Sequence, residues 1–307
     1  MIKYVMTAAA LKSFSTSPQT KRMYRLLGNR LGQSRRIQYG VSEKYQDRAR
    51  RILELCERYN AIQKGDRLLE VGTGWVHWEA TILRLFYDVE ITLFDVWDNR
   101  QLGAYKHYFG QLERIIDREL DIDPNQRERA HSLLRGISKT NSFDEIYDLL
   151  GFSYVINPSG TLEQFQDDTF TVIFSCNVLE HIERDILPDY IQDFHRILKP
   201  GGHSIHQIDL GDHLANYDKN ASLMNYLRYS NKKWKWYFEN DVQYINRVQR
   251  PDWLHIYQKA GLEMVEEETV FADIGKIKVH KSYEHLCKQD LQCITMRVVH
   301  RKSPLNK

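Results

Sequence analysis

The residues best suited to chemistry lie in a glycine loop and at the ends of two apolar runs. Arg67–Trp75 reads RLLEVGTGW, in which an apolar run and an acid precede two glycines spaced by one residue. Glycine lets a chain turn sharply and brings backbone close to a ligand. Glu90–Asp95 is a second apolar run that ends in an acid. The separation of the two runs is the one at which a carboxylate meets ribose hydroxyls in nucleotide-binding α/β proteins, so the pattern predicts a nucleotide-like ligand.

The kind of ligand follows from what the loop contains and what it lacks. A dinucleotide loop has a third glycine where this chain has His77, and a phosphate-binding P-loop needs a Gly-Lys-Ser/Thr that is absent here. Glu70 lies just before the first glycine. An acid there would repel a pyrophosphate but suits a cationic or amine-bearing ligand. The alternative interpretation is an ordinary strand-to-helix turn that uses two glycines.

Two histidines that follow later apolar runs, His181 and His213, are candidates for proton transfer. Imidazole is the side chain best poised to take a proton near neutral pH, so either could deprotonate a hydroxyl group. The alternatives are that His181 packs or hydrogen-bonds within a turn and that His213 is a surface-loop residue. Asp209 and Asp212 precede His213 without flanking acids at a recognised spacing, so no metal site is expected.

Four motifs occur in the order in which one enzyme family has them. They are Arg67–Trp75, Glu90–Asp95, Phe170–Ile182 and Leu198–His203. Together they resemble the class I S-adenosylmethionine (SAM)-dependent methyltransferases, and more narrowly the type 11-like group. The first motif of that family ends in a third glycine, where this chain has Val76.

The resemblance implies an α/β fold with a Rossmann-like, doubly wound sheet of seven strands. The expected strand order is 3-2-1-4-5-7-6 with strand 7 antiparallel, together with a helical N-terminal addition and a cap insertion after strand 5. We expect residues 1–60 to form the addition, as a lid, and residues 61–307 to form the SAM-binding methyltransferase domain. Within it, the aromatic-rich residues 211–250 would cap the substrate. The alternative is a loop and helix packed on the sheet by their aromatic side.

The resemblance also implies which residues bind SAM. In the family, the residue after the second acid packs on the adenine ring, which points to Val96 or to Trp97, although Trp97 could equally be a core residue. The turn at Asn177 lies beside the methionine part in the family. The family's adenine-binding Asp is missing near Gly160 and Thr161, so a hydroxyl or a backbone group would recognise the adenine there. The predicted cofactor-binding residues are Glu70, Gly72, Thr73, Gly74, Trp75, Asp95, Val96, Gly160, Thr161, Leu162, Cys176 and Asn177.

The predicted reaction is methyl transfer from SAM to an oxygen atom of a small or medium-sized molecule. A sugar or secondary metabolite is expected, because the chain resembles a bacterial subgroup associated with surface glycans and specialised metabolites. Positioning of the acceptor supplies much of the acceleration in such a transfer, and His181 or His213 would act as the base. Methylation of nucleic-acid bases is disfavoured, because Ser175–Val178 lacks both the Asn-Pro-Pro-Tyr turn and a Pro-Cys nucleophile.

Two other functions stay open. Residues 1–40 contain eight Lys or Arg and no Asp or Glu, so the enzyme could methylate a protein or an RNA bound by this basic segment. The chain could also be a non-catalytic SAM-fold binding subunit.

The elements that position these residues can be placed from hydrophobic periodicity. Helices are expected at Pro18–Leu31, Glu43–Tyr59 and Trp75–Leu85. The first would present Leu26, Leu27 and Leu31 over the substrate mouth. The fifth strand is expected at His203–Ile208.

Composition sets outer limits on the protein. Its 307 residues carry a net charge of +2 and are 42% hydrophobic, which is typical of a globular protein. No apolar run approaches the roughly 18 residues of a transmembrane helix. The four scattered cysteines fit a reducing compartment, so a cytoplasmic location is expected. The oligomeric state stays open, a homo-oligomer included.

Overall fold

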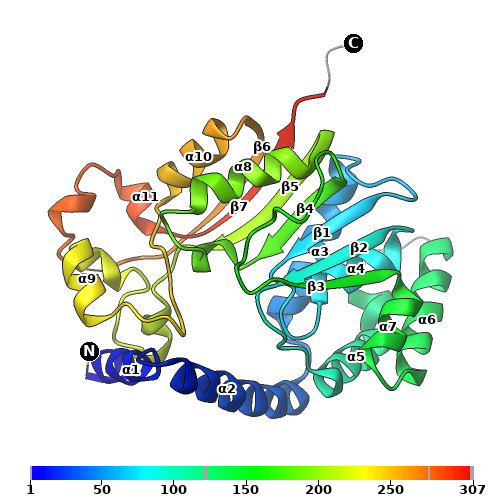
Figure 1. The fold of residues 1–307 in the computed structure, drawn as a ribbon, viewed down its shortest axis with the longest axis horizontal. Helices are drawn as coiled ribbons and strands as arrows, with labels where there is room; N and C mark the ends of the chain where they lie inside the picture. The colour runs from blue at the N-terminus through cyan, green and yellow to red at the C-terminus, as the bar shows by residue number, and fades with distance from the viewer. Residues whose placement is uncertain (1, 120–123, 276, 305–307) are drawn as a thin grey trace. The chain divides into compact units, whose positions relative to one another are not determined.

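Seven strands form one sheet in the order β3-β2-β1-β4-β5-β7-β6, with β7 antiparallel (Figure 1). This computed structural model describes residues 2–119, 124–275 and 277–304. The strands are β1 Arg67–Val71, β2 Glu90–Asp95, β3 Phe152–Ile156, β4 Phe170–Cys176, β5 Leu198–Asp209, β6 Leu262–Phe271 and β7 Cys293–Lys302. The strand order and the reversed last strand confirm the predicted fold class.

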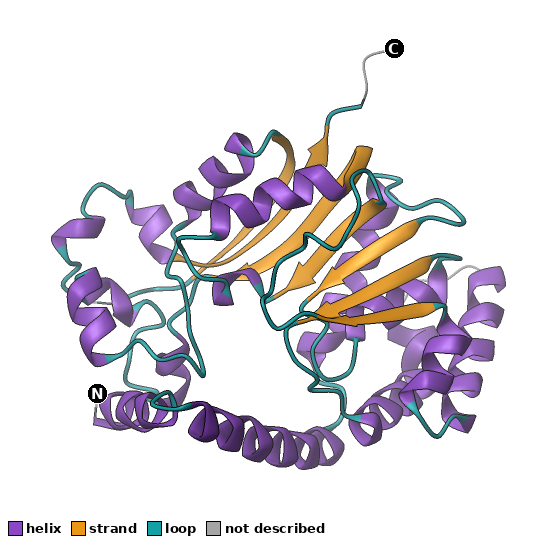
Figure 2. Ribbon diagram, in the orientation of Figure 1, coloured by secondary structure: helices purple, strands orange, loops and turns teal. Residues whose placement is uncertain are grey.

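Helices connect the strands, as Figure 2 shows. The α-helices are α1 Ile2–Phe14, α2 Pro18–Tyr39, α3 Glu43–Arg58, α4 Trp78–Phe86, α5 Leu102–Glu119, α6 Pro124–Lys139, α7 Phe143–Leu150, α8 Leu187–Ile197, α9 Asn231–Tyr237, α10 Arg250–Lys259 and α11 Lys288–Gln292. The 3-10 turns are η1 Leu179–His181, η2 His213–Tyr217, η3 Asn225–Arg228 and η4 Lys281–Tyr283. None of the helices in the described ranges has the length and apolar character that crossing a membrane requires.

Three predicted elements differ from the structure at their ends. The helix expected from Trp75 begins only at Trp78, because His77 takes a left-handed conformation (φ 41°) that a helix cannot continue through. The fifth strand begins at Leu198, earlier than expected. Helix α2 extends to Tyr39, and the three leucines expected to cover the substrate mouth are exposed.

The chain divides into two compact units, which we describe separately. The first comprises residues 29–175, 196–204 and 302–304 and contains the glycine loop, so we call it the loop unit. The second comprises residues 2–28, 176–195 and 205–301 and contains both candidate histidines, so we call it the histidine unit. The predicted division at residue 60 stays a prediction, and its outer ends, residue 1 and residues 305–307, lie outside the described residues.

In the loop unit, β1 pairs in parallel with β2 and with β4, and β2 pairs with β3. After its first residue, each of β1 and β2 is buried throughout. Continuous apolar runs are typical of parallel strands covered on both faces. Helix α4 packs against β2, α3 and α6, and this packing fixes the turn that leads from β1 into α4.

A buried polar network lies beneath that turn. Glu70 is only 4% exposed, and Thr73 Oγ1 donates a hydrogen bond to its Oε2 atom. His77 continues the chain: its Nδ1 lies 2.7 Å from Thr73 Oγ1 and its Nε2 lies 2.9 Å from the Tyr147 hydroxyl. Burial lowers the pKa of His77 to about 3, so the ring is neutral. The side chain of His77 therefore serves to lock the glycine turn.

A second acid, Glu79, lies near the Glu70 carboxyl group and changes its pKa. Burial raises the pKa of Glu70, the nearby Glu79 adds to the rise, and together they bring it to about 8. Glu79 itself is held by Arg48 of α3, which binds both carboxylate oxygens. This bidentate pair joins α3 to α4.

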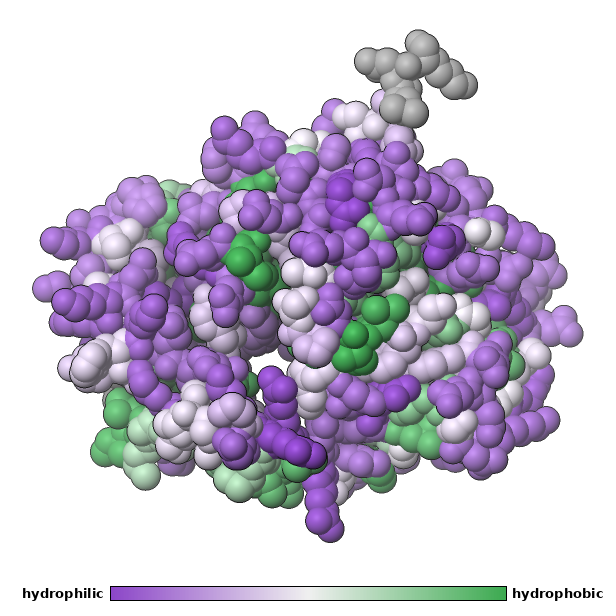
Figure 3. Space-filling view, viewed as in Figure 1, coloured by the Kyte–Doolittle hydropathy of each residue, from purple (hydrophilic) through white to green (hydrophobic). Residues whose placement is uncertain are grey.

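In the histidine unit, α1 packs against the aromatic-rich segment 211–250 and a later turn. The buried cluster they form contains Tyr4, Ala8, Leu11, Leu214, Met224, Tyr226, Leu227, Trp234, Phe238, Ile245 and Tyr283. The aromatic side of the segment is thus buried, although Trp236 is 73% exposed. On the outer side of α1, Ile2, Val5 and Met6 are exposed, and apolar surface is visible at this end of the molecule (Figure 3).

One hydrogen bond anchors α1 to the segment before η2. The Tyr4 hydroxyl donates to Asp212 Oδ2 at 2.6 Å, and Asp212 Oδ1 accepts from the Leu214 N–H at 3.0 Å, which caps η2. Burial raises the pKa of Asp212 to about 6, while the Tyr4 hydrogen bond opposes that rise. The first helix therefore fixes the start of η2, where His213 lies.

The raised pKa of Glu70 predicts a pH-dependent stability. A group whose pKa is higher in the folded than in the unfolded protein favours the fold when protonated. That contribution is fully present below the unfolded pKa and is lost as the pH rises through about 8. We therefore expect Glu70→Gln to flatten the fall in unfolding free energy between about pH 5 and about pH 8, measured by urea denaturation. The exposed Glu57→Gln should keep the wild-type slope, and an unchanged slope in Glu70→Gln would contradict the expectation.

The Tyr4 hydrogen bond predicts a loss of stability on its removal. Tyr4→Phe keeps the ring but leaves the buried Asp212 carboxylate without one donor, so unfolding free energy should fall by about 1–3 kcal/mol. Urea denaturation measures this change. Tyr39→Phe, at an exposed tyrosine, is the matched control and should be neutral. A Tyr4→Phe protein as stable as the control would show that the hydrogen bond contributes nothing.

Candidate functional site

The glycine loop is shaped by backbone conformations that favour glycine. Gly72 and Gly74 have φ angles of 69° and 65°, in the left-handed region where a side chain is strained. The N–H of Gly72 donates to the carbonyl of Phe94 at 2.8 Å, and the N–H of Gly74 donates to Asp95 Oδ2 at 3.1 Å. A Cβ atom added at Gly74 would meet nothing closer than 3.9 Å. The loop therefore presents open backbone beside the acid of β2.

Asp95 ends β2 directly beside this loop. Its Oδ1 accepts from the Val96 N–H at 2.8 Å and its Oδ2 from Gly74. Burial raises the pKa of Asp95, and the backbone N–H groups of Gly74, Val96 and Trp97 oppose the rise. A carboxylate offers about four acceptor positions, so the backbone bonds from Gly74, Val96 and Trp97 leave room for a hydroxyl donor from a ligand.

A second loop lies next to Val96. Gly160 has a φ of 74°, and a Cβ atom added there would lie 3.4 Å from Val96 Cγ1. The side chain of Asn157 holds this loop by donating to the carbonyl of Thr161 at 3.0 Å. Val96 is 41% exposed, whereas Leu162 is fully buried. The apolar face of Val96 is therefore available to a flat ring, and the side chain of Leu162 is not.

Trp75 makes contacts that the sequence did not predict. The guanidinium of Arg36, in α2, lies 3.6 Å from the centroid of the Trp75 ring, a cation–π arrangement. The indole Nε1 donates to Asn29 Oδ1 at 3.1 Å, and Gln101 donates to the carbonyl of Asn29 at 3.1 Å. Part of the N-terminal segment thus rests directly on the glycine loop.

The turn after β4 belongs to the histidine unit and is held from β5. Asn177 has a φ of 57°, and its N–H donates to the carbonyl of Gln207 at 2.8 Å. The Gln207 amide donates back to Asn177 Oδ1 at 3.0 Å and accepts from Arg297 Nε at 2.8 Å. The turn that begins at Cys176 is therefore rigidly placed at the end of the strand.

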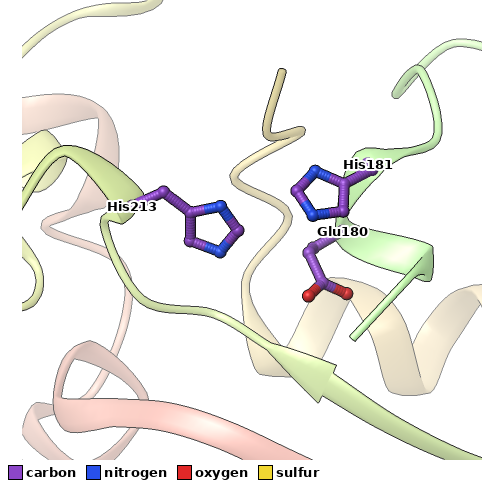
Figure 4. A group of neighbouring side chains, drawn as sticks. All are labelled: Glu180, His181 and His213. Carbon is purple, nitrogen blue, oxygen red and sulfur yellow. The ribbon is translucent and has the colours of Figure 1, made fainter. Parts of the chain in front are cut away.

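The structure brings the two candidate histidines together. The ring centroids of His181 and His213 lie 5.1 Å apart with the ring planes tilted by 59°, and Figure 4 shows the two rings side by side with the Glu180 side chain below them. His181 Nδ1 lies 2.6 Å from the carbonyl oxygen of Tyr244. His213 Nε2 lies 3.5 Å from Asp209 Oδ2.

Side chains outside the two turns hold the turns that carry the histidines. The side chain of Asn246 donates to the carbonyls of Leu179 and Ile182 at 2.9 and 3.1 Å, so it clamps the η1 turn around His181. His213 begins η2, whose first turn is capped by Asp212. These supports lie in the segment after β5, for which the sequence offered only a general expectation of a cap.

The electrostatic setting keeps one of the two rings neutral. The protein packed around His181 lowers its pKa to about 4, and His213 adds to the effect. Because a carbonyl can only accept, the proton of neutral His181 is on Nδ1, which leaves Nε2 with a free lone pair. The pair can therefore accept a proton or bind a cation.

The predicted site residues thus fall into two groups. Those from Glu70 to Leu162 lie in the loop unit, and Cys176, Asn177, His181 and His213 lie in the histidine unit. Glu70 and Thr73 hold the loop from below. Residues that the sequence did not single out are Asn29, Arg36, His77, Tyr244 and Asn246. Only His77 had a local signal, its place where a third glycine was expected.

Several solved structures resemble the chain weakly. A protein of Bacillus halodurans, provisionally named a methyltransferase, is 15% identical over 82% of this chain and 98% of its own, with a TM-score of 0.44. Phosphoethanolamine N-methyltransferase 2 of Haemonchus contortus, in complex with SAM, is 15% identical over 82% and 52%, with a TM-score of 0.46. A SAM-dependent methyltransferase of Methanosarcina mazei is 12% identical over 81% and 97%, with a TM-score of 0.44. At these values the neighbours say nothing about the substrate.

A search of the curated proteins gives no match. The family model described as "Methyltransferase domain" matches residues 41–267, well over half of the chain. The glycine loop, the acid of β2 and the turn after β4 all lie inside that range. The chain therefore belongs to this family of methyltransferases, whose cofactor is SAM.

Proposed function

We propose that the protein methylates an oxygen atom of a small or medium-sized hydroxylated molecule, with a sugar or specialised metabolite as the acceptor. The observation that carries this proposal is the pair His181 and His213, whose rings lie 5.1 Å apart. A hydroxyl group needs a base as it attacks, and a neutral imidazole supplies one near pH 7. An amine acceptor that is already unprotonated would not need a base.

The cofactor residues proposed from the sequence fit the adenosyl part of SAM. The open backbone at Gly74 accommodates a ligand at close range. Asp95 would accept hydrogen bonds from the ribose hydroxyls, and the exposed face of Val96 would pack on the adenine. The hydroxyl or backbone of Thr161 would recognise the adenine edge. When bound, SAM supplies an electrophilic methyl group on a sulfonium.

The chain's own residues would then orient the acceptor and remove its proton. Nε2 of His181 carries a free lone pair, while its Nδ1 is held by the carbonyl of Tyr244. Asp209, 3.5 Å from His213, would stabilise that ring once it took up a proton.

The basic N-terminal segment favours RNA or protein binding less than its composition suggested. Lys12 donates to the backbone carbonyls of Lys235 and Trp236, Lys21 pairs with Asp241, and Arg36 stacks on Trp75. These three of the eight cations are paired within the protein, so they are less available for phosphate groups. Methylation of a macromolecule and a purely binding function remain the alternatives that the assays below would expose.

The first experiment tests the cofactor site. Asp95→Ala removes the proposed acceptor for the ribose hydroxyls, so calorimetric titration should show SAM affinity at least about tenfold weaker, since hydrogen bonds to charged groups contribute roughly 1.5–3 kcal/mol. Asp148→Ala, at an exposed aspartate of the same unit, is the control and should bind as wild type. Thermal melts of each variant establish that it is folded. Undiminished SAM binding by Asp95→Ala would refute the site.

The second experiment tests the acceptor chemistry. Purified protein, SAM and a panel of hydroxylated sugars and phenols are assayed for S-adenosylhomocysteine, with RNA and protein extracts alongside. For the acceptor that reacts, His181→Ala and His213→Ala should lower kcat by roughly 10²–10⁴-fold and leave SAM affinity unchanged. The exposed His255→Ala should be neutral. Turnover of RNA or protein alone, or full activity in both histidine variants, would overturn the proposal.

A further inference from the structure

We propose that Glu180, His181 and His213 form a binding site for a divalent transition-metal cation. The ligand atoms that these three side chains offer all lie within 4.8 Å of one another. All three residues belong to the histidine unit, and Figure 4 shows them converging from η1 and from the start of η2. This set was not predicted from the sequence, where the only metal site considered consisted of Asp209, Asp212 and His213.

The spacing is close to what a cation needs. Metal–ligand bonds of about 2.1 Å place two ligands roughly 3.4 Å apart in a tetrahedral site. Side-chain rotations that bring the ligand atoms up to about 1.4 Å closer would complete the set. Glu180 and His181 are neighbours on η1, whose turn is held by Asn246. His213 lies on a separate turn, so the cation would cross-link two segments.

The surroundings of both rings match those of metal-binding histidines. A ligating imidazole usually gives its second ring nitrogen to a backbone carbonyl or a carboxylate, which fixes its orientation. His181 meets the carbonyl of Tyr244 through Nδ1, at 2.6 Å, and presents Nε2 to the cluster. His213 approaches Asp209 through Nε2, at 3.5 Å, and retains Nδ1 as a ligand.

Charge and burial also favour a cation. Glu180 is only 2% exposed, and burial strengthens the attraction of a carboxylate for a positive ion. Two imidazoles and one carboxylate suit Zn²⁺ or Fe²⁺ better than Mg²⁺, which prefers oxygen ligands.

Three protein ligands leave at least one coordination position open, as in catalytic metal sites. His181 is exposed at the surface of the unit, so that position is accessible. The role of the cation in methyl transfer rests on the proposed function: it would bind the acceptor hydroxyl and lower its pKa. The two imidazoles would then act as ligands and no longer as bases. Binding of the cation itself does not depend on that function.

The test is a metal titration of the full-length protein after dialysis against a chelator. Calorimetry with Zn²⁺ should give one ion per chain, and Co²⁺ should develop visible d–d absorption. Glu180→Gln, His181→Ala and His213→Ala should each weaken Zn²⁺ binding by at least about tenfold, roughly 1.4 kcal/mol. The matched controls are Glu183→Gln, an exposed residue close to His181 in the sequence, and His255→Ala, an exposed residue of α10. Both should bind Zn²⁺ as the wild type does.

The outcomes are separable from those of the proposed function. No Zn²⁺ or Co²⁺ binding, or equal binding in all three variants, overturns the metal site. Because a variant could fail to fold, each is checked by its thermal melt, and the Co²⁺ spectrum of the wild type must show imidazole ligation independently. SAM is titrated into the same samples. SAM binding without metal binding refutes only the metal site, and metal binding without SAM binding refutes only the methyltransferase proposal.

Discussion

The loop unit depends on the burial of one carboxyl group. Glu70 is the last residue but one of β1, where almost no water reaches it, and a buried carboxyl is tolerated only when its oxygens are satisfied. Thr73 supplies a donor, and His77 and Tyr147 extend the network. This network fixes the backbone conformation of Gly72 and Gly74 above it. The backbone that Gly74 turns toward Asp95 is a consequence of how the acid below it is accommodated.

In the histidine unit, two short turns that follow strands, η1 and η2, must be held in place. Neither η1 nor η2 is long enough to be stable alone. Asn246 clamps the first through two carbonyls. Tyr4 and Asp212 fix the second. Side chains from distant parts of the sequence thus set the distance between His181 and His213, and the aromatic cluster around Trp234 includes Leu214 of η2.

What could be predicted from sequence was what local patterns encode. Apolar runs such as Glu90–Asp95 identified strands to the residue, and motif order identified the sheet. The start of α4 was missed because a positive φ at His77 leaves no mark in hydrophobic periodicity. Arg36 on Trp75, and Tyr244 beside His181, could not be foreseen, because such contacts join residues far apart whose types are compatible with many partners. His181 and His213 were each predicted separately from the sequence, and their proximity is visible only in the fold.

The contact between Tyr4 and Asp212 also bears on how the chain is made. The two residues are 208 positions apart, and ribosomes add about 5–20 residues each second, so α1 waits roughly 10–40 seconds for its partner. During that interval its apolar residues, Ala8 and Leu11 among them, have no core to enter. The loop unit between them can fold first as the chain emerges. Nascent α1 is therefore the segment that chaperones would be expected to hold.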